Sequence, residues 1–178
     1  MNPQWRIFRL NEGETIASFD CGDEDLNDFI HNEAKLYRKA LLAMSYGVLD
    51  ETQSKVVGYF SLANDRISLG DFVTKTEFNR FRKRRFVNEK RLKSYPAVKI
   101  CRLGVDIAAR GQHVGSFILH FIKMYFTNDN KTGCRFLTVD AYAEAVPFYL
   151  KNGFFPLNDD DKNDRTRLLY FDLNDVLS

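Results

Sequence analysis

The chain has 178 residues, of which 44% are hydrophobic and 14% aromatic, and its formal net charge is +2. This length suits one domain with a buried core, and this composition excludes a disordered chain. No apolar run approaches the roughly 20 residues that a membrane helix needs, so we expect no membrane association. We therefore expect a single globular domain over residues 1–178.

Three cysteines, Cys21, Cys101 and Cys134, show no CxxC spacing and have no histidine arranged beside them. This pattern indicates neither a zinc site nor a disulfide framework, so we expect no metal. An odd number of thiols and the lack of a signal-peptide pattern favour a reducing, cytoplasmic location.

Hydrophobic periodicity predicts strands and helices that alternate along the chain. The predicted strands span residues 4–10, 43–50, 55–63, 97–105, 134–140, 154–157 and 166–172, and residues 65–71 extend the same sheet. The predicted helices begin after the N-cap Asp23, occupy part of residues 74–94, and span residues 114–127 and 144–152. This alternation predicts a mixed α/β (α+β) fold, with a central twisted sheet of about seven strands flanked by about four helices.

The small net charge hides one strongly basic segment, residues 74–94. It contains nine basic and two acidic residues, whereas the rest of the chain contains 17 basic and 22 acidic residues. Phenylalanines are interleaved among these charges. The segment is either a solvated amphipathic helix or a surface for a polyanion, and its excess of positive charge favours the polyanion. The candidate polyanion-binding residues are Arg80, Arg82, Lys83, Arg84 and Arg85.

Residues 98–116 form the most informative stretch, in which an apolar run ends in a glycine-containing loop before a helix. Glycines let a backbone approach a ligand closely, and N–H groups at the start of a helix bind phosphate. The loop has neither the Gly-Lys-Ser/Thr of a P-loop nor the spacing of a dinucleotide fingerprint. By itself the stretch supports a phosphate-binding loop and an ordinary strand-to-helix turn about equally.

A second motif lies in residues 145–154, where a Phe-Tyr pair on a helix is followed by Gly-Phe at the start of a strand. It resembles a signature of the GCN5-related N-acetyltransferase (GNAT) superfamily. The loop at residues 110–115 resembles that family's acetyl-coenzyme A pyrophosphate motif, with Arg110 and Gly115 matching its ends. His113 stands where the motif has its central glycine.

The resemblance spans roughly residues 4–173 and implies an enzyme that transfers acetyl from acetyl-coenzyme A directly to a primary amine. It implies that the strands at 97–105 and 134–140 splay apart around the pantetheine arm. Tyr149 would be the general acid that protonates the departing thiolate, and its alternative role is that of a core aromatic. The implied cofactor-binding residues are Leu103, Gly104, Val105, Arg110, Gly111, Gln112, His113, Val114, Gly115 and Ser116.

The N-terminal half is similar to one branch of the superfamily, through residues 19–22, 26–30 and 57–62. Members of that branch are toxins that acetylate the amino group of aminoacyl-tRNA and pair with ribbon-helix-helix antitoxins. The resemblance implies that the basic segment contacts tRNA. It also implies that the protein binds a ribbon-helix-helix antitoxin and forms a homodimer. Two alternatives stay open: acetylation of a small-molecule amine or protein N-terminus, and a non-catalytic nucleic-acid-binding or regulatory domain.

Overall fold

A computed structural model describes residues 4–83, 85–86, 92–128 and 132–177. Arg84, from the basic segment, lies outside the described residues. Those residues form one sheet of seven strands in the order β1-β2-β3-β4-β5-β7-β6, which confirms the predicted mixed sheet. The strands are β1 (Trp5–Arg9), β2 (Met44–Asp50), β3 (Lys55–Ser68), β4 (Ser94–Val105), β5 (Phe136–Tyr142), β6 (Phe155–Pro156) and β7 (Thr166–Asp172).

The helices also match the expected alternation. They are α1 (Glu24–Asp28), which continues through a π turn at Phe29–Glu33 into α2 (Ala34–Lys39), then α3 (Lys75–Lys83), α4 (Val114–Thr127) and α5 (Val146–Lys151). Asp23 caps α1 as predicted, because its Oδ1 accepts a hydrogen bond from the N–H of Leu26 at 2.9 Å. The continuous segment from α1 to α2 counts as one helix, so the described residues contain the four helices that the periodicity predicts.

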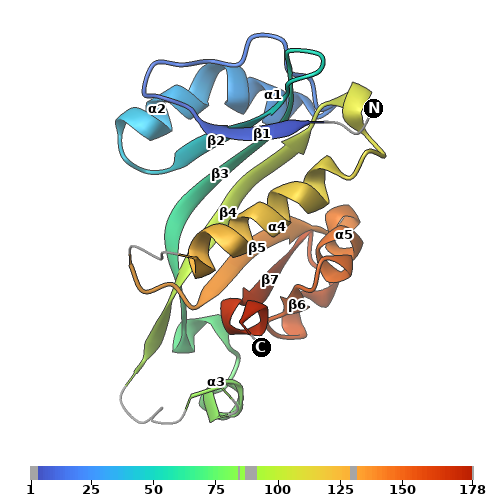
Figure 1. Ribbon diagram of the computed structural model, residues 1–178. Coiled ribbons are helices and arrows are strands. Elements are labelled where there is room, and N and C mark those ends of the chain that lie inside the picture. The colour runs from blue at the N-terminus through green and yellow to red at the C-terminus, as the bar shows by residue number, and fades with distance from the viewer. Residues whose placement is uncertain (1–3, 84, 87–91, 129–131, 178) are drawn as a thin grey trace. The chain divides into compact units, whose positions relative to one another are not determined.

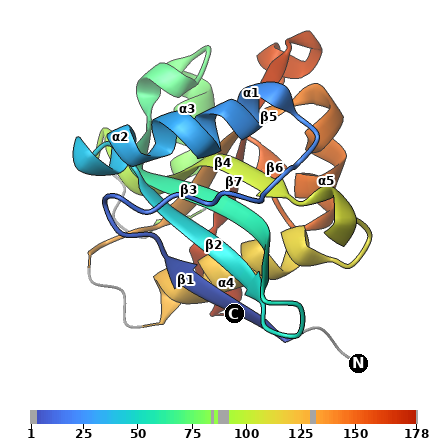
Figure 2. The ribbon, with the colours of Figure 1, turned by 90° about the horizontal axis from the view of Figure 1, so that it is seen from above.

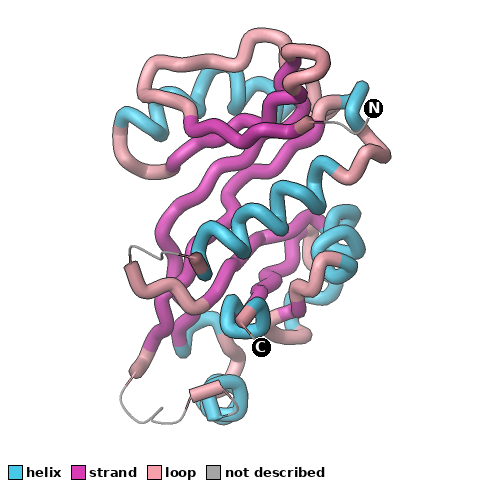
Figure 3. The backbone as a smooth tube through the Cα atoms, in the orientation of Figure 1, coloured by secondary structure: helices cyan, strands magenta, loops and turns pink. Residues whose placement is uncertain are grey.

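The predicted extension at residues 65–71 is strand only in its first part. β3 runs on to Ser68, and Leu69–Asp71 then forms a 3-10 turn. The carboxylate of Asp71 accepts a hydrogen bond from the N–H of Ser68 at 2.6 Å, which closes a capping box and ends the strand. Strands, helices and loops of the described residues are coloured separately in Figure 3.

One compact unit comprises Met1–Ala63 and Ile100–Ile122. In it β1, β2 and β3 pair antiparallel, and α1 and α2 lie on one face of these strands while the start of α4 lies on the other (Figures 1 and 2). Tyr59 of β3 is buried in a cluster with Phe29, whereas the ring of Phe60 lies 6.2 Å from that of Phe121 on α4. Successive residues of β3 therefore serve opposite layers.

The other compact unit comprises Asn64–Lys99 and Lys123–Ser178. β7 pairs antiparallel with both β5 and β6, and β4 pairs in parallel with β5 through Ala97–Lys99 against Phe136–Thr138. The core of this unit joins the aromatic face of α3 to the sheet. Its buried members are Ile67, Phe78, Phe81, Tyr95, Ala97, Phe136, Leu157 and Tyr170.

Candidate active site

The loop between β4 and α4 consists of a 3-10 turn followed by two left-handed residues. Asp106 caps the turn at Ile107–Ala109, because its Oδ1 accepts a hydrogen bond from the N–H of Ala108 at 3.0 Å. Gly111 and His113 then adopt φ angles of +78° and +66°. Helix α4 begins directly after them, so these two conformations set the geometry of the helix entry.

The first turn of α4 presents N–H groups that no carbonyl of the helix can reach. The first helical hydrogen bond runs from the N–H of Phe117 to the carbonyl of His113, at 3.0 Å. The N–H groups of Val114, Gly115 and Ser116 therefore have no acceptor within the helix. They lie at the positive end of a 14-residue helix, where a phosphate group is stabilised by both charge and hydrogen bonding. The donor set of this loop fits a pyrophosphate.

The backbone conformation at His113 accounts for the glycine that the related motif has at this position. A left-handed φ brings Cβ close to the following carbonyl, so a residue other than glycine adopts it at a cost. His113 adopts it nevertheless, and its side chain is exposed. The loop backbone at His113 therefore has the left-handed conformation that glycine adopts readily, and the imidazole lies in solvent.

The end of β4 carries the other expected cofactor contacts. Leu103 and Val105 are half-buried, and Gly104 between them is buried. None of the three has a polar side chain, so any polar contact with a ligand here must come from the main chain. Together with the loop and the first turn of α4, these residues all belong to the first unit.

Tyr149 lies in the second unit, in α5, and is 6% exposed. Its ring lies edge-on to Phe148 at 5.1 Å and to Phe154 at 5.4 Å between centroids. Burial raises the pKa of the Tyr149 phenol above its ordinary value, so the phenol stays protonated across the physiological range. A protonated phenol has the state that a proton donor requires.

The basic segment divides into exposed and inward-facing cations. Arg80 and Lys83 are exposed on α3, and the half-buried Arg82 lies 5.5 Å from the ring of Phe78. The guanidinium of Arg85 instead donates a hydrogen bond to the hydroxyl of Tyr170 at 2.6 Å. It also lies 3.5 Å from the carboxylate of Asp172 and over the ring of Phe81. Arg85 therefore serves the core of its own unit, which the charge pattern did not predict.

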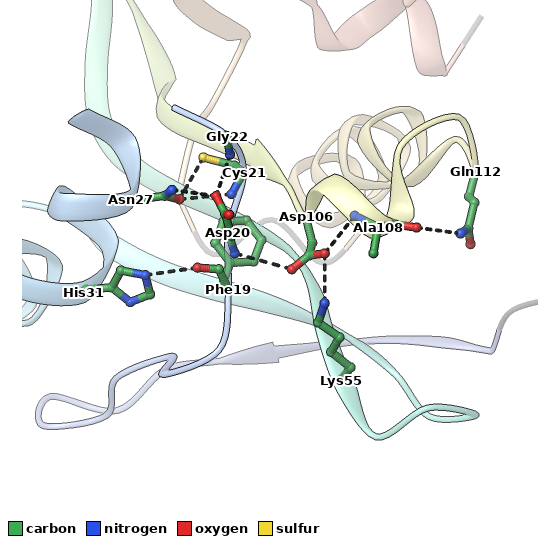
Figure 4. A network of polar contacts seen from close by, with 10 residues as sticks. All are labelled: Phe19, Asp20, Cys21, Gly22, Asn27, His31, Lys55, Asp106, Ala108 and Gln112. Atoms are coloured by element: carbon green, nitrogen blue, oxygen red, sulfur yellow. Dashed lines mark hydrogen bonds and ion pairs between the residues drawn. The ribbon is translucent and has the colours of Figure 1, made fainter. Parts of the chain in front are cut away.

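Sequence reasoning missed a buried polar network beneath the loop, shown in Figure 4. The carboxylate of Asp106 is its centre, and Oδ1 lies 2.9 Å from Nζ of Lys55. Its Oδ2 accepts a longer hydrogen bond, 3.4 Å, from the N–H of Asp20. The available signal was an aspartate directly after an apolar strand, a position that often caps the next turn.

Four other ionisable side chains, two acidic residues and two histidines, have structural partners or lie in solvent. Asp140 forms an ion pair with Lys99, and Glu144 is exposed. Both ring nitrogens of His31 lie within hydrogen-bond distance of backbone carbonyls, at 2.8 and 3.0 Å, whereas His120 is exposed. Across the described ranges no group of three or more His, Cys, Asp and Glu side chains could hold a metal ion.

The family resemblance is confirmed by comparison with known proteins. A family model described as an acetyltransferase (GNAT) domain matches residues 86–172. The match includes the candidate cofactor loop and Tyr149.

None of the helices in the described part of the chain is long and apolar enough to cross a bilayer.

Solved structures similar to nearly the whole chain include forms of two proteins, KacT and AtaT. A tyrosine-to-phenylalanine mutant of KacT is 21% identical, with 98% of each chain covered and a TM-score of 0.72. AtaT complexed with acetyl-methionyl-tRNAfMet is 22% identical, also with 98% of each chain covered, and its TM-score is 0.75. A mutant AtaT toxin bound to acetyl-CoA and the C-terminus of the antitoxin AtaR is 21% identical, with 97% of this chain and 95% of that chain covered and a TM-score of 0.65. At these identities the likeness establishes the fold.

Proposed function

We propose that this protein is an acetyl-coenzyme A-dependent N-acetyltransferase whose acceptor is the amino group of aminoacyl-tRNA. The observation that carries the proposal is the helix entry at Gly111–Ser116, which lies inside the matched GNAT domain and includes three N–H groups, those of residues 114–116, with no acceptor within the helix. A phosphorylated cofactor suits such a donor set.

Different segments of the chain would bind different parts of acetyl-coenzyme A. The N–H groups of Gly111 and of residues 113–116 would hold the pyrophosphate, whereas the N–H of Gln112 donates to the carbonyl of Ala109 at 3.3 Å. The main chain of Leu103–Val105 would hold the pantetheine and polarise the acetyl carbonyl. One amino group of the Arg110 guanidinium is hydrogen-bonded to the carbonyl of Cys21, at 2.6 Å, so Arg110 contributes to the loop partly through its anchoring. Acetyl-coenzyme A, when bound, supplies the acetyl group as an activated thioester.

Tyr149 would act as the general acid. Tyr149 would donate its phenolic proton to the sulfur as the amine displaces that sulfur from the acetyl carbon, and a proton from water would then restore the phenol. The attacking amine loses one proton to water. Burial raises the pKa of the phenol and keeps it protonated at neutral pH, and the same burial makes it a weaker acid, because it disfavours the phenolate that donation leaves.

The preference for tRNA rests on charge. Arg80 and Lys83 present two exposed cations on one short helix, and the buried Phe78 and Phe81 fix that helix to its unit. Clustered cations that are held in place bind phosphates with release of counterions. The similar protein AtaT has been solved with an acetylated aminoacyl-tRNA, which favours the same acceptor class here.

Partners and location follow from the same proposal. AtaT has been solved with the antitoxin AtaR, and we extend this to a ribbon-helix-helix antitoxin and a homodimer for this chain. The acceptor occurs in the cytoplasm, where we expect the protein to act.

Calorimetric titration of the purified protein with acetyl-coenzyme A tests the cofactor assignment directly. We expect saturable binding to one site per chain, and the absence of heat would leave a nucleic-acid-binding or regulatory domain as the better account. Acetyl transfer from the same preparation to a panel of small amines and peptides tests the acceptor. Efficient transfer to those amines, with none to charged tRNA, would favour a small-molecule or protein acetyltransferase.

A further inference from the structure

The cofactor loop, Asp106–His113, is joined to a distant segment of the same unit, Phe19–Gly22, which we call the anchor segment. The N–H of Ile107 donates a hydrogen bond to the carbonyl of Asp20 at 2.8 Å. In the other direction, the N–H of Asp20 donates to Oδ2 of Asp106 at 3.4 Å. Figure 4 shows the anchor segment and the carboxylate of Asp106 side by side.

Arg110 adds a third connection, since its guanidinium donates to the carbonyl of Cys21 at 2.6 Å. This approach requires a glycine at position 22, where φ is +76° and a Cβ would lie 3.0 Å from the same guanidinium nitrogen. The carboxylate of Asp20 then ties the anchor segment to α1, because Oδ1 accepts hydrogen bonds from the N–H of Gly22 at 2.8 Å and from the side chain of Asn27 at 2.7 Å. The anchor segment, more than 80 residues earlier in the chain, thus holds the loop through three hydrogen bonds.

Asp106 is the centre of this arrangement and is only 2% exposed. A buried carboxylate is costly unless it is both hydrogen-bonded and matched by a cation. Oδ1 receives the N–H of Ala108 at 3.0 Å and Nζ of Lys55 at 2.9 Å. The side chain of Lys55, 34% exposed, is the cation that these contacts give to Asp106.

We propose that Lys55 is a positioning residue for the cofactor: through Asp106 it holds the loop in the conformation whose amides bind the pyrophosphate. This inference rests on the proposed function, because it takes acetyl-coenzyme A as the ligand of the loop. Without the ammonium group, the buried carboxylate must draw in water or move. Either change displaces the turn that Asp106 caps and thereby weakens the hold on the pyrophosphate.

Comparing acetyl-coenzyme A with a donor that lacks the pyrophosphate tests whether Lys55 acts through the pyrophosphate contacts. Lys55→Met is expected to raise the dissociation constant of coenzyme A, measured by calorimetry, on the order of tenfold. It should raise the KM for acetyl-coenzyme A similarly and leave kcat nearly unchanged. With S-acetylpantetheine as donor, kcat/KM should be the same in variant and wild type, since that donor has no pyrophosphate for the loop to hold. Lys55→Arg, which restores the cation, should recover most of the affinity.

The matched control is Arg6→Met, which removes the cation of an exposed ion pair with Glu51 in the same unit, at 2.8 Å. It should leave coenzyme A binding unchanged. If Lys55→Met unfolds, Lys55→Gln keeps a hydrogen-bond donor without the charge and serves in its place. Equal coenzyme A affinity in wild type and variants, or an equal loss with S-acetylpantetheine, would overturn the positioning role alone. A wild-type protein that binds no coenzyme A would overturn the proposed function and this inference together.

Discussion

Gly111 and His113 both adopt left-handed backbone conformations, with φ angles of +78° and +66°, on either side of Gln112. The first is glycine and the second is not. This pair of conformations turns the chain from the 3-10 turn into α4, whose first turn is the proposed phosphate site. The two positions therefore differ in how they should respond to substitution.

Gly111→Ala is expected to lower the free energy of unfolding by about 1–2 kcal/mol, because alanine is strained at this φ. Nothing lies within 4 Å of a Cβ built at this position, so the cost is conformational and not steric. His113→Gly should have the opposite tendency, a gain of up to about 1 kcal/mol after the added entropy of the unfolded chain is offset. Urea denaturation measures both. Gly13→Ala is the control, since a Cβ there also meets nothing and no left-handed φ is required; a loss equal to that of Gly111→Ala would refute the explanation.

Tyr149→Phe is expected to reduce kcat by roughly 10²–10⁴-fold, the usual contribution of a general acid. The substitution keeps the buried ring and its contacts with Phe148 and Phe154, so stability and coenzyme A affinity should stay near those of the wild type. Single-turnover kinetics together with calorimetry separates the two effects. An unchanged turnover rate would leave Tyr149 as a core aromatic.

The double variant Arg80→Ala/Lys83→Ala is expected to raise the KM for charged tRNA and to reduce the salt dependence of that KM, by a slope of about 1–2. Both side chains are exposed, so the melting temperature should not change. Lys35→Ala/Lys39→Ala on α2 removes the same charge from another exposed surface and serves as the control. An equal effect from both pairs would indicate non-specific attraction of tRNA and no dedicated surface on α3.

Alkaline pH should destabilise the protein through Cys134. Burial raises the pKa of this thiol to about 11, from an ordinary value of 9.0. Between these values the unfolded chain loses the thiol proton while the native protein keeps it, so the free energy of unfolding falls as pH rises. The contribution is fully present below about pH 9. Denaturation under reducing conditions should show a shallower decline in Cys134→Ala, and parallel curves for the two proteins would contradict this assignment.

The elements and the glycine-containing turn into α4 were predictable because their signals are local. The capping aspartate, the hairpin and the glycine-containing loop each depend on residues a few positions apart, where spacing alone predicts geometry. Asp23 illustrates this, since its bond to the N–H of Leu26 spans three residues.

The network beneath the loop and the inward role of Arg85 depend on contacts between distant parts of the chain. Lys55 and Asp106 are separated by 51 residues, and Arg85 and Tyr170 by 85. A count of charges treats every arginine of a basic segment alike. Which of them faces solvent depends on where Tyr170 and Asp172 are placed by β7, and that requires the fold.

Acetyl transfer to aminoacyl-tRNA tests the central claim most directly. The protein is incubated with labelled acetyl-coenzyme A and total charged tRNA, and the amino acids released by mild alkali are analysed by mass spectrometry. We predict N-acetylated amino acids from charged tRNA, none from deacylated tRNA, and a strong reduction with Tyr149→Phe. Coenzyme A binding without any acetylated amino acid from a complete charged tRNA pool would contradict the proposed acceptor.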